Sequence, residues 1–164
     1  MKNIIELSKE DFISNNILRK VSKIVEHDDP QITQDILELI QAFESSLISV
    51  GLSAPQIGIF KRIIVVNIKK DQNPDHIVMI NPEIIQITGS KKIMKETCLS
   101  LPNFRGPVQR KDKVRVKYLG MEGNVKIEDY TGFMSRVIQH EIDHLLGVLY
   151  VDRMNSLSLL ESVN

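Results

Sequence analysis

The first third of the chain carries one long stretch in which apolar residues recur every three or four positions. Over residues 28–49 these positions are Ile32, Ile36, Ile40, Phe43 and Leu47. This spacing is typical of an amphipathic helix whose apolar stripe faces a core. Asp29 can cap the start of the helix, and Pro30 suits its first position. We therefore expect a long N-terminal helix here.

Shorter β-branched segments follow a break rich in glycine and proline, Gly-Leu-Ser-Ala-Pro-Gln-Ile-Gly at residues 51–58. Their composition predicts strands at residues 62–68, 76–80 and 83–88, with Asn81–Pro82 as a turn between the last two. Farther along, two more such segments flank the sequence Gly-Met-Glu-Gly and predict a hairpin of residues 114–119 and 125–130.

A second helix is predicted near the C-terminus, with Thr131 as its cap and Gly147 as its stop. One stripe of this helix is polar, at Gly132, Arg136, Gln139 and Asp143. Most of the remaining circumference is apolar, at Phe133, Met134, Val137, Ile138, Ile142 and Leu145. A helix so widely apolar is buried. We therefore expect an α+β fold, a single domain of residues 1–164 in which mostly antiparallel strands pack around this central helix.

Composition narrows the possible partners. Lys plus Arg and Asp plus Glu both number 21, so no net charge attracts nucleic acid or an anionic membrane. Two basic runs are expected to be solvated strand edges and loops: Lys91, Lys92 and Lys95, and Arg110, Lys111 and Lys113. The single cysteine cannot form an internal disulfide. The N-terminus lacks the features of a signal peptide, and no apolar run approaches a membrane span, so we expect a cytoplasmic protein.

Candidate chemistry begins with the sequence Gln-His-Glu-Ile-Asp-His-Leu-Leu-Gly at residues 139–147. His140 and His144 lie four positions apart, on one face of a helix, where two imidazoles can bind one ion. Glu141 can then act as general base toward water at the ion. The alternative is a pair of structural histidines. A buried helix needs partners for all three polar groups, and a metal supplies them together, which favours the metal site.

A catalytic metal needs a third protein ligand, and the residues leave several candidates. Metzincins place a third histidine six residues after the second, but that position here is Tyr150. Glu161 lies downstream, close to the chain end, in what we expect to be a fraying helix. Cys98 follows a predicted strand, although a lone cysteine is more often a small buried hydrophobe. Two further histidines, expected to be exposed in polar loops, are His27 and His76.

With these residues assembled, the chain resembles the peptide deformylases from residue 17 to residue 153. Three motifs carry the resemblance: residues 51–58, the sequence Glu-Thr-Cys-Leu-Ser at 96–100, and residues 139–147. Each motif alone is moderately specific, but three in this order are strong evidence for homology. The resemblance implies hydrolysis of the N-formyl group from the starting methionine of new polypeptides, with release of formate.

The resemblance also implies roles for individual residues. Cys98, His140 and His144 are expected to hold one divalent metal, which the family implies is Fe²⁺ in cells, with Zn²⁺, Ni²⁺ or Co²⁺ possible in purified protein. Glu141 is expected to exchange the proton of the attacking water. The side-chain amide of Gln56 and the backbone N–H of Leu99 are expected to stabilise the developing oxyanion.

Substrate contacts and partners are further expectations. Gly51 is expected to let the substrate backbone pass close, and the peptide to lie extended beside residues 49–51. The partners are N-formylmethionyl nascent peptides, with transient proximity to the ribosome and no direct contact with nucleic acid or membrane. We expect a monomer.

Two positions qualify the resemblance. Thr97 stands where the family usually has glycine, and a stiff β-branched residue there either crowds the substrate groove or fits an extended backbone. A deformylase-like protein of reduced or altered activity is therefore an alternative, and a metallopeptidase that uses Glu161 as ligand is another.

Asp143 lies on the polar stripe, and in this family such an acid tends to pair with an arginine, here Arg105 or Arg110.

Overall fold

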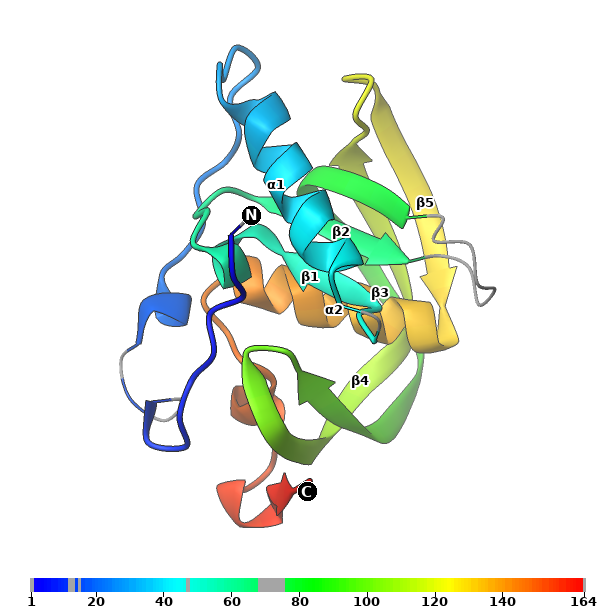
Figure 1. Cartoon of the computed structure of the whole chain (residues 1–164). Helices are drawn as coiled ribbons and strands as arrows, with labels where there is room; N and C mark the ends of the chain where they lie inside the picture. The colour runs from blue at the N-terminus through cyan, green and yellow to red at the C-terminus, as the bar shows by residue number, and fades with distance from the viewer. Residues whose placement is uncertain (1, 12–13, 15, 47, 68–75, 164) are drawn as a thin grey trace.

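A computed structural model describes residues 2–11, 14, 16–46, 48–67 and 76–163. Its sheet follows the order β1-β2-β3-β4-β5, every neighbouring pair is antiparallel, and β6 pairs with β4. The strands are β1 (Gly51–Ser53), β2 (Ile63–Asn67), β3 (His76–Cys98), β4 (Leu101–Leu119), β5 (Val125–Thr131) and β6 (Glu161–Ser162). The α-helices are α1 (Ile32–Glu44) and α2 (Gly132–Leu145), and short 3₁₀ segments are η2 (Ile17–Arg19), η3 (Ala54–Ile57), η4 (Tyr150–Arg153) and η5 (Leu157–Leu159). The α+β prediction with antiparallel strands is confirmed (Figure 1).

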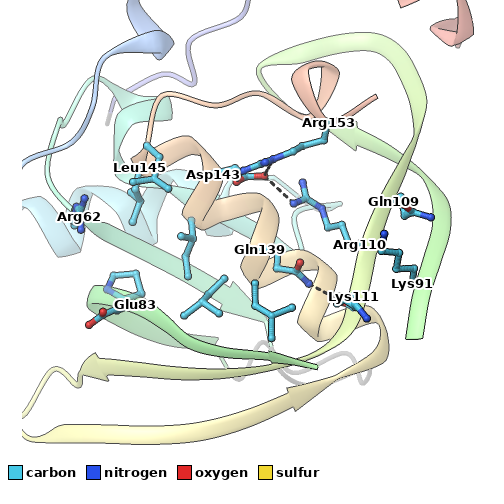
Figure 2. Close-up of a pocket in the computed structure, with 15 residues that line it drawn as sticks. Arg62, Glu83, Lys91, Gln109, Arg110, Lys111, Gln139, Asp143, Leu145 and Arg153 are labelled. Atoms are coloured by element: carbon cyan, nitrogen blue, oxygen red, sulfur yellow. Dashed lines mark hydrogen bonds and ion pairs between the residues drawn. The ribbon is translucent and has the colours of Figure 1, made fainter. Parts of the chain in front are cut away.

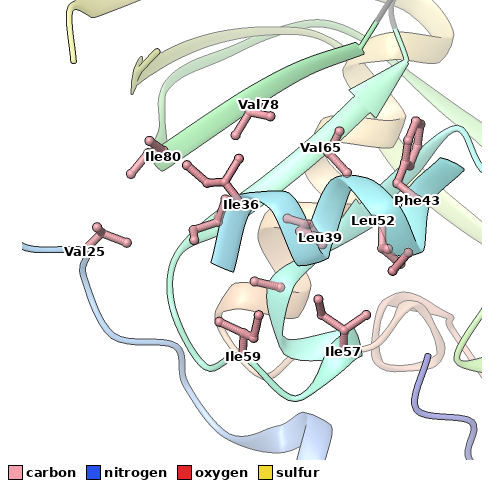
Figure 3. Close-up of a cluster of buried hydrophobic side chains, with 13 residues drawn as sticks. Val25, Ile36, Leu39, Phe43, Leu52, Ile57, Ile59, Val65, Val78 and Ile80 are labelled. Atoms are coloured by element: carbon pink, nitrogen blue, oxygen red, sulfur yellow. The ribbon is translucent and has the colours of Figure 1, made fainter. Parts of the chain in front are cut away.

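The sheet is covered on both faces near β2, which explains the uninterrupted apolar run in that strand. Ile63 and Val65 belong to the cluster that α1 covers, whereas Ile64 and Val66 pack with α2. Successive side chains of a strand point to opposite faces, so a strand buried on both sides must be apolar throughout. Figure 3 shows α1 lying over the first cluster, with Ile36, Leu39 and Phe43 directed into it.

Helix α1 begins later than predicted. Its N-cap is Gln31, and Asp29 and Pro30 precede it. The Asp29 carboxylate instead accepts from the backbone N–H of Gln31 and forms an ion pair with Lys61 at 2.6 Å. The sequence analysis therefore placed the cap two residues too early. Leu47, the last position of the predicted stripe, lies outside the described residues.

The predicted turn at Asn81–Pro82 was wrong, because β3 continues through it to Cys98. The ladder with β4 shifts register between Ile80 and Glu83, and Asn81 has a φ of 51°. Asparagine tolerates this left-handed conformation better than most residues. Its side chain accepts from the backbone N–H of Val25 and donates to the carbonyl of Val25, at 2.8 and 2.9 Å. The strand bulges here to bind the N-terminal segment rather than to reverse direction.

The hairpin predicted around Gly-Met-Glu-Gly is confirmed. It joins β4 to β5, with Leu119 paired to Val125, and Gly123 has a φ of 77°. Among the described residues, no helix is long and apolar enough to cross a bilayer.

Helix α2 ends before Gly147, which has a φ of 73°. The helix is buried on more of its circumference than predicted, because Arg136, Gln139 and Asp143 on its polar stripe are at most 9% exposed. Phe133, predicted to be buried, is 52% exposed. Figure 1 shows why: α2 lies between the sheet and the hairpin formed by the end of β3 and the start of β4, so its polar stripe meets other chain segments.

Candidate metal centre

Three side chains from two elements converge on one point. Cys98 is the last residue of β3, and His140 and His144 lie one turn apart on α2. One ligand atom from each of the three residues lies within 4.8 Å of the others. The Cys98 sulfur is 3.3 Å from Nε2 of His144, and the two imidazole centroids are 5.0 Å apart. The structure therefore brings together the three residues that the sequence analysis proposed as ligands.

His140 is oriented by a glutamate to which the sequence analysis gave no role. Nδ1 of His140 lies 3.0 Å from the Glu96 carboxylate, and the imidazole stacks on the Tyr150 ring at 6.2 Å. A carboxylate on one ring nitrogen fixes the tautomer and leaves the other nitrogen for a metal. A signal was present in the sequence, since Glu96 lies two residues before Cys98 and a strand places both side chains on one face.

Glu96 is the centre of a buried ionic network. Arg110 donates to it twice, at 2.7 and 3.0 Å, and Arg136 donates once, at 2.5 Å. Burial opposes its ionisation, but hydrogen bonds from His140 and Arg110 lower the pKa of Glu96 to about 2. Glu96 is therefore an anion at neutral pH.

Asp143 extends this network and is not solvated. Arg110 donates to its carboxylate at 2.8 Å, and Arg153 donates from the other side at 2.7 Å. Of the two arginines considered from the sequence, Arg110 is thus the partner, whereas Arg105 pairs with Glu161. Arg110 is 6% exposed, so the expectation that its basic run is solvated was wrong for this residue.

Gln56 points its amide toward the Cys98 sulfur. Oε1 of Gln56 accepts from the backbone N–H and hydroxyl of Ser53, at 2.9 and 2.7 Å. Nε2 donates to the Ser100 hydroxyl at 3.1 Å and lies 3.5 Å from the Cys98 sulfur. Ser53 and Gln56 form a capping box on η3. The local turn therefore fixes which end of the amide faces the cluster.

Glu141 is buried between α2 and β1. Burial raises the pKa of its carboxyl group to about 7, against the opposing effect of His140. A Cβ added to Gly51 would lie 2.7 Å from Oε1 of Glu141. The glycine therefore lets β1 approach the carboxylate closely, a reason that differs from the substrate passage proposed from the sequence.

The cluster opens into a groove of about 550 Å³ whose lining includes Gly51, Gln56, Thr97, Leu99 and Glu141. Thr97 is exposed in the extended backbone of β3, opposite Arg105 of β4. Threonine fits this conformation, so the concern that its backbone requires glycine is removed. Its position in the groove leaves the crowding hypothesis as a prediction.

The residues present fit a divalent metal. A thiolate with two imidazoles is a donor set that suits Zn²⁺ and Fe²⁺. Nε2 of His144 faces the Cys98 sulfur, and Oε2 of Glu141 is buried without a hydrogen-bond partner among the described residues. Burial also lowers the pKa of His144 well below its usual value, and the neutral imidazole is the form that binds metals.

The other ligand candidates are engaged elsewhere. Glu161 lies in β6, not in a helix, and its carboxylate pairs with Lys95 and Arg105. Tyr150 stacks on His140. His27 is exposed as expected, but His76 is partly buried against Phe43 and was wrongly expected to be exposed.

Comparisons with known proteins point to one family. The sequence profile of the polypeptide deformylase family matches residues 2–159. The peptide deformylase of Desulforudis audaxviator is 40% identical over 141 residues, which cover 86% of this chain and 89% of the relative. The peptide deformylase of Brachyspira hyodysenteriae is 38% identical over 143 residues, or 85% of this chain and 76% of the relative.

Solved structures agree as well. A peptide deformylase from Legionella pneumophila superposes with a TM-score of 0.82 at 36% identity, covering 96% of this chain and 88% of that one. A peptide deformylase from Synechococcus elongatus in complex with actinonin gives 0.81 at 34% identity, covering 96% and 80%. By profile, sequence identity and fold alike, the chain belongs to the peptide deformylase family.

Proposed function

We propose that this protein removes the N-formyl group from the N-terminal methionine of newly made polypeptides through the cluster of Cys98, His140 and His144. The observation that carries the proposal is the convergence of these three side chains with Glu141 and Gln56 at one groove. Nucleophilic, acid–base and oxyanion-stabilising groups are then all within one site, as amide hydrolysis requires.

Cys98, His140 and His144 hold the metal. When bound, a divalent cation would lower the pKa of a neighbouring water to about 7 and would polarise a carbonyl oxygen. The native ion is Fe²⁺, as the family implies, and Zn²⁺, Ni²⁺ or Co²⁺ can replace it in purified protein. Glu96 holds His140 in the tautomer that coordinates through Nε2, since its carboxylate lies at Nδ1.

Glu141 moves the proton. Its carboxylate takes a proton from the attacking water and returns it to the leaving amine. Burial favours this exchange because a carboxyl group in a low-dielectric site can hold and release a proton near neutral pH. Oε2 of Glu141 has no hydrogen-bond partner among the described residues, so its lone pairs are not engaged by another side chain.

Gln56 and Leu99 stabilise the oxygen of the formyl group as it becomes negative. Nε2 of Gln56 is already directed toward the Cys98 sulfur, because Ser53 holds the other end of the amide. A donor that is fixed before reaction does not reorganise when charge develops. The backbone N–H of Leu99, next to the ligand Cys98, supplies the second donor.

The substrate lies extended beside β1, which ends the strand order of the described sheet. Residues 48–51 line the groove on this side, and an edge strand offers backbone groups to a peptide. The protein acts as a single-domain monomer in the cytoplasm, close to ribosomes where nascent chains emerge, without direct nucleic-acid or membrane contact. The metallopeptidase alternative requires Glu161 as the third metal ligand. The carboxylate of Glu161 is instead paired with Lys95 and Arg105, which disfavours this alternative.

The test is metal analysis of anaerobically purified protein, combined with formate release from a formyl-methionyl peptide. Cys98→Ala should remove stoichiometric metal and turnover, whereas Glu161→Ala should keep both. Glu141→Gln should keep the metal and lower kcat by about 10²–10⁴-fold. Retention of metal by Cys98→Ala, or full turnover by Glu141→Gln, would refute the assignment.

A further inference from the structure

A second groove, of about 610 Å³, lies on the side of α2 away from the metal cluster. It shares no lining residue with the groove at Cys98. Its volume is within the range of small-molecule sites. Figure 2 shows it between α2 and the strands, with Lys91, Gln109 and Lys111 at one end and Arg62 and Glu83 at the other. The proposed deformylase chemistry makes no use of this groove.

The middle of this second groove is apolar. Ile84, Ile142 and Leu145 contribute buried or half-buried surface. Two further apolar side chains are left open to solvent, because Ile87 of β3 is 51% exposed and Leu146, just after α2, is 43% exposed. Exposed apolar groups that line a concave surface can bind the aliphatic or aromatic part of a ligand.

The lining of the groove carries a net positive charge, although the whole chain is neutral. Two carboxylates line it, Glu83 and Asp143, against five cations: Arg62, Lys91, Arg110, Lys111 and Arg153. Counting also Glu96, which Arg110 binds behind the wall, still leaves a formal charge of +2. A cleft lined by one sign of charge raises the local concentration of the opposite ion.

Two of these cations, Lys91 and Lys111, lie opposite each other at one end of the groove. Lys91 of β3 is directly paired with Lys111 of β4. Like charges directly opposite in a sheet are destabilising. Neither lysine forms an ion pair with a carboxylate of the described residues; Nζ of Lys111 donates to the Gly89 carbonyl, and the nearby Asp112 accepts from the backbone N–H of Ser90. An anion bound between the lysines would relieve this repulsion.

We propose that this groove binds a small amphipathic carboxylate. Its head group lies between Lys91 and Lys111, where the positive charge is unpaired, and its apolar body covers Ile87 and Leu146. A purely ionic ligand would leave the apolar surface exposed, and an uncharged one would leave the lysine pair uncompensated. The inference is independent of the deformylase reaction, because no residue of the metal cluster takes part.

The test uses the zinc-loaded full chain and four probes below their micellar concentrations: decanoate, decanamide, decyltrimethylammonium and acetate. Methyl NMR shifts of Ile87 and Leu146 report occupancy of this groove, and those of Val50 and Val137 report occupancy of the metal groove. Decanoate should shift the first pair and bind about tenfold more tightly than decanamide or the cation, because of the added charge–charge attraction. Acetate should cause no shift at comparable concentrations.

Two matched pairs of variants locate the site. Lys91→Glu should weaken decanoate binding by about tenfold, and Lys92→Glu, on the neighbouring residue outside the groove, by less than about twofold. Ile87→Thr should weaken binding, and Ile93→Thr, exposed in the same strand outside the groove, should not. Equal binding of the cationic probe, equal effects of the two lysine variants, binding of acetate alone, or shifts confined to Val50 and Val137 would each overturn the proposal.

Discussion

Gly51→Ala is the sharpest test of how β1 and α2 fit together at the general base. The added Cβ would lie 2.7 Å from Oε1 of Glu141 and 2.8 Å from Cγ1 of Val137. Ordinary contact begins at 3.4 Å, so one partner must move by roughly 0.7 Å in a packed interior. Glu141 can give way more readily than the strand, and that motion takes its carboxylate away from the position occupied beside the metal cluster.

The expected consequence is a loss of turnover with the metal retained. A misplacement on the order of 1 Å at a reacting group can cost about 10²-fold in rate, so we expect kcat to fall by roughly that factor. Inserting a methyl group into a packed site destabilises by about 1–3 kcal/mol. Each kcal/mol corresponds to about 2–4 °C in the unfolding midpoint for a domain of this size. Metal content should not change, because the three atoms nearest the new Cβ belong to Glu141 and Val137.

The assay is formate release together with metal analysis and calorimetry of the same samples. Val137→Ala, alone and combined with Gly51→Ala, separates the two contacts. The double variant should recover part of the lost stability, since the Val137 methyl group is gone, but keep a low kcat, since Glu141 remains crowded. A Gly51→Ala protein with the kcat and unfolding midpoint of the parent would refute this reasoning.

Three further changes test other contacts. Asp143 lies between Arg110 and Arg153, and Asp143→Asn should lower the free energy of unfolding by about 3–5 kcal/mol in thermal unfolding. The control Arg105→Ala, at the exposed pair with Glu161, should lower it by about 1 kcal/mol or less. Equal shifts of the two variants would contradict the buried network. Thr97→Gly should raise turnover of formyl peptides if the threonine crowds the groove, and no gain with any peptide would reject crowding. Gln56→Ala should lower kcat by about 10²–10³-fold with metal retained, and an unchanged rate would exclude its amide from oxyanion stabilisation.

Local patterns predicted the elements that local forces decide. The hairpin at Gly-Met-Glu-Gly and the end of α2 before Gly147 follow from turn residues, and β2 (Ile63–Asn67) follows from an unbroken apolar run. Residue 68, the last position of the predicted strand, lies outside the described residues. The turn predicted at Asn81–Pro82 was wrong because these two residues are compatible with two different backbone structures. They suit a turn, but they also suit a bulge when a distant partner, here the backbone of Val25, binds the asparagine side chain.

The candidate site was also predicted only in part, and for the same reason. His140 and His144 were proposed as ligands because their spacing on a helix is itself chemical information, and Cys98 was chosen from several candidates because of the family resemblance. The burial of Gln139 and Asp143 was not predicted. A polar stripe on a helix predicts solvent exposure, and the sequence does not show which other segment packs over it. Arg110 of β4 and Arg153 of η4 pair with Asp143, and the Lys111 carbonyl of β4 accepts from Gln139. Such long-range pairing leaves no periodic signal.

The buried network is better explained by positioning than by stability. Replacing buried ion pairs with apolar groups is often neutral or stabilising, so their presence alone is weak evidence for a gain in free energy. Here, however, the proposed metal ligands come from β3 and α2, so their convergence depends on where the helix lies along the strand. Glu96 binds Arg136 and His140, one turn apart on α2, and lies two residues before Cys98. A shift of α2 by one turn would move a different side chain onto Glu96, so this carboxylate favours the register in which Cys98 and both imidazoles meet.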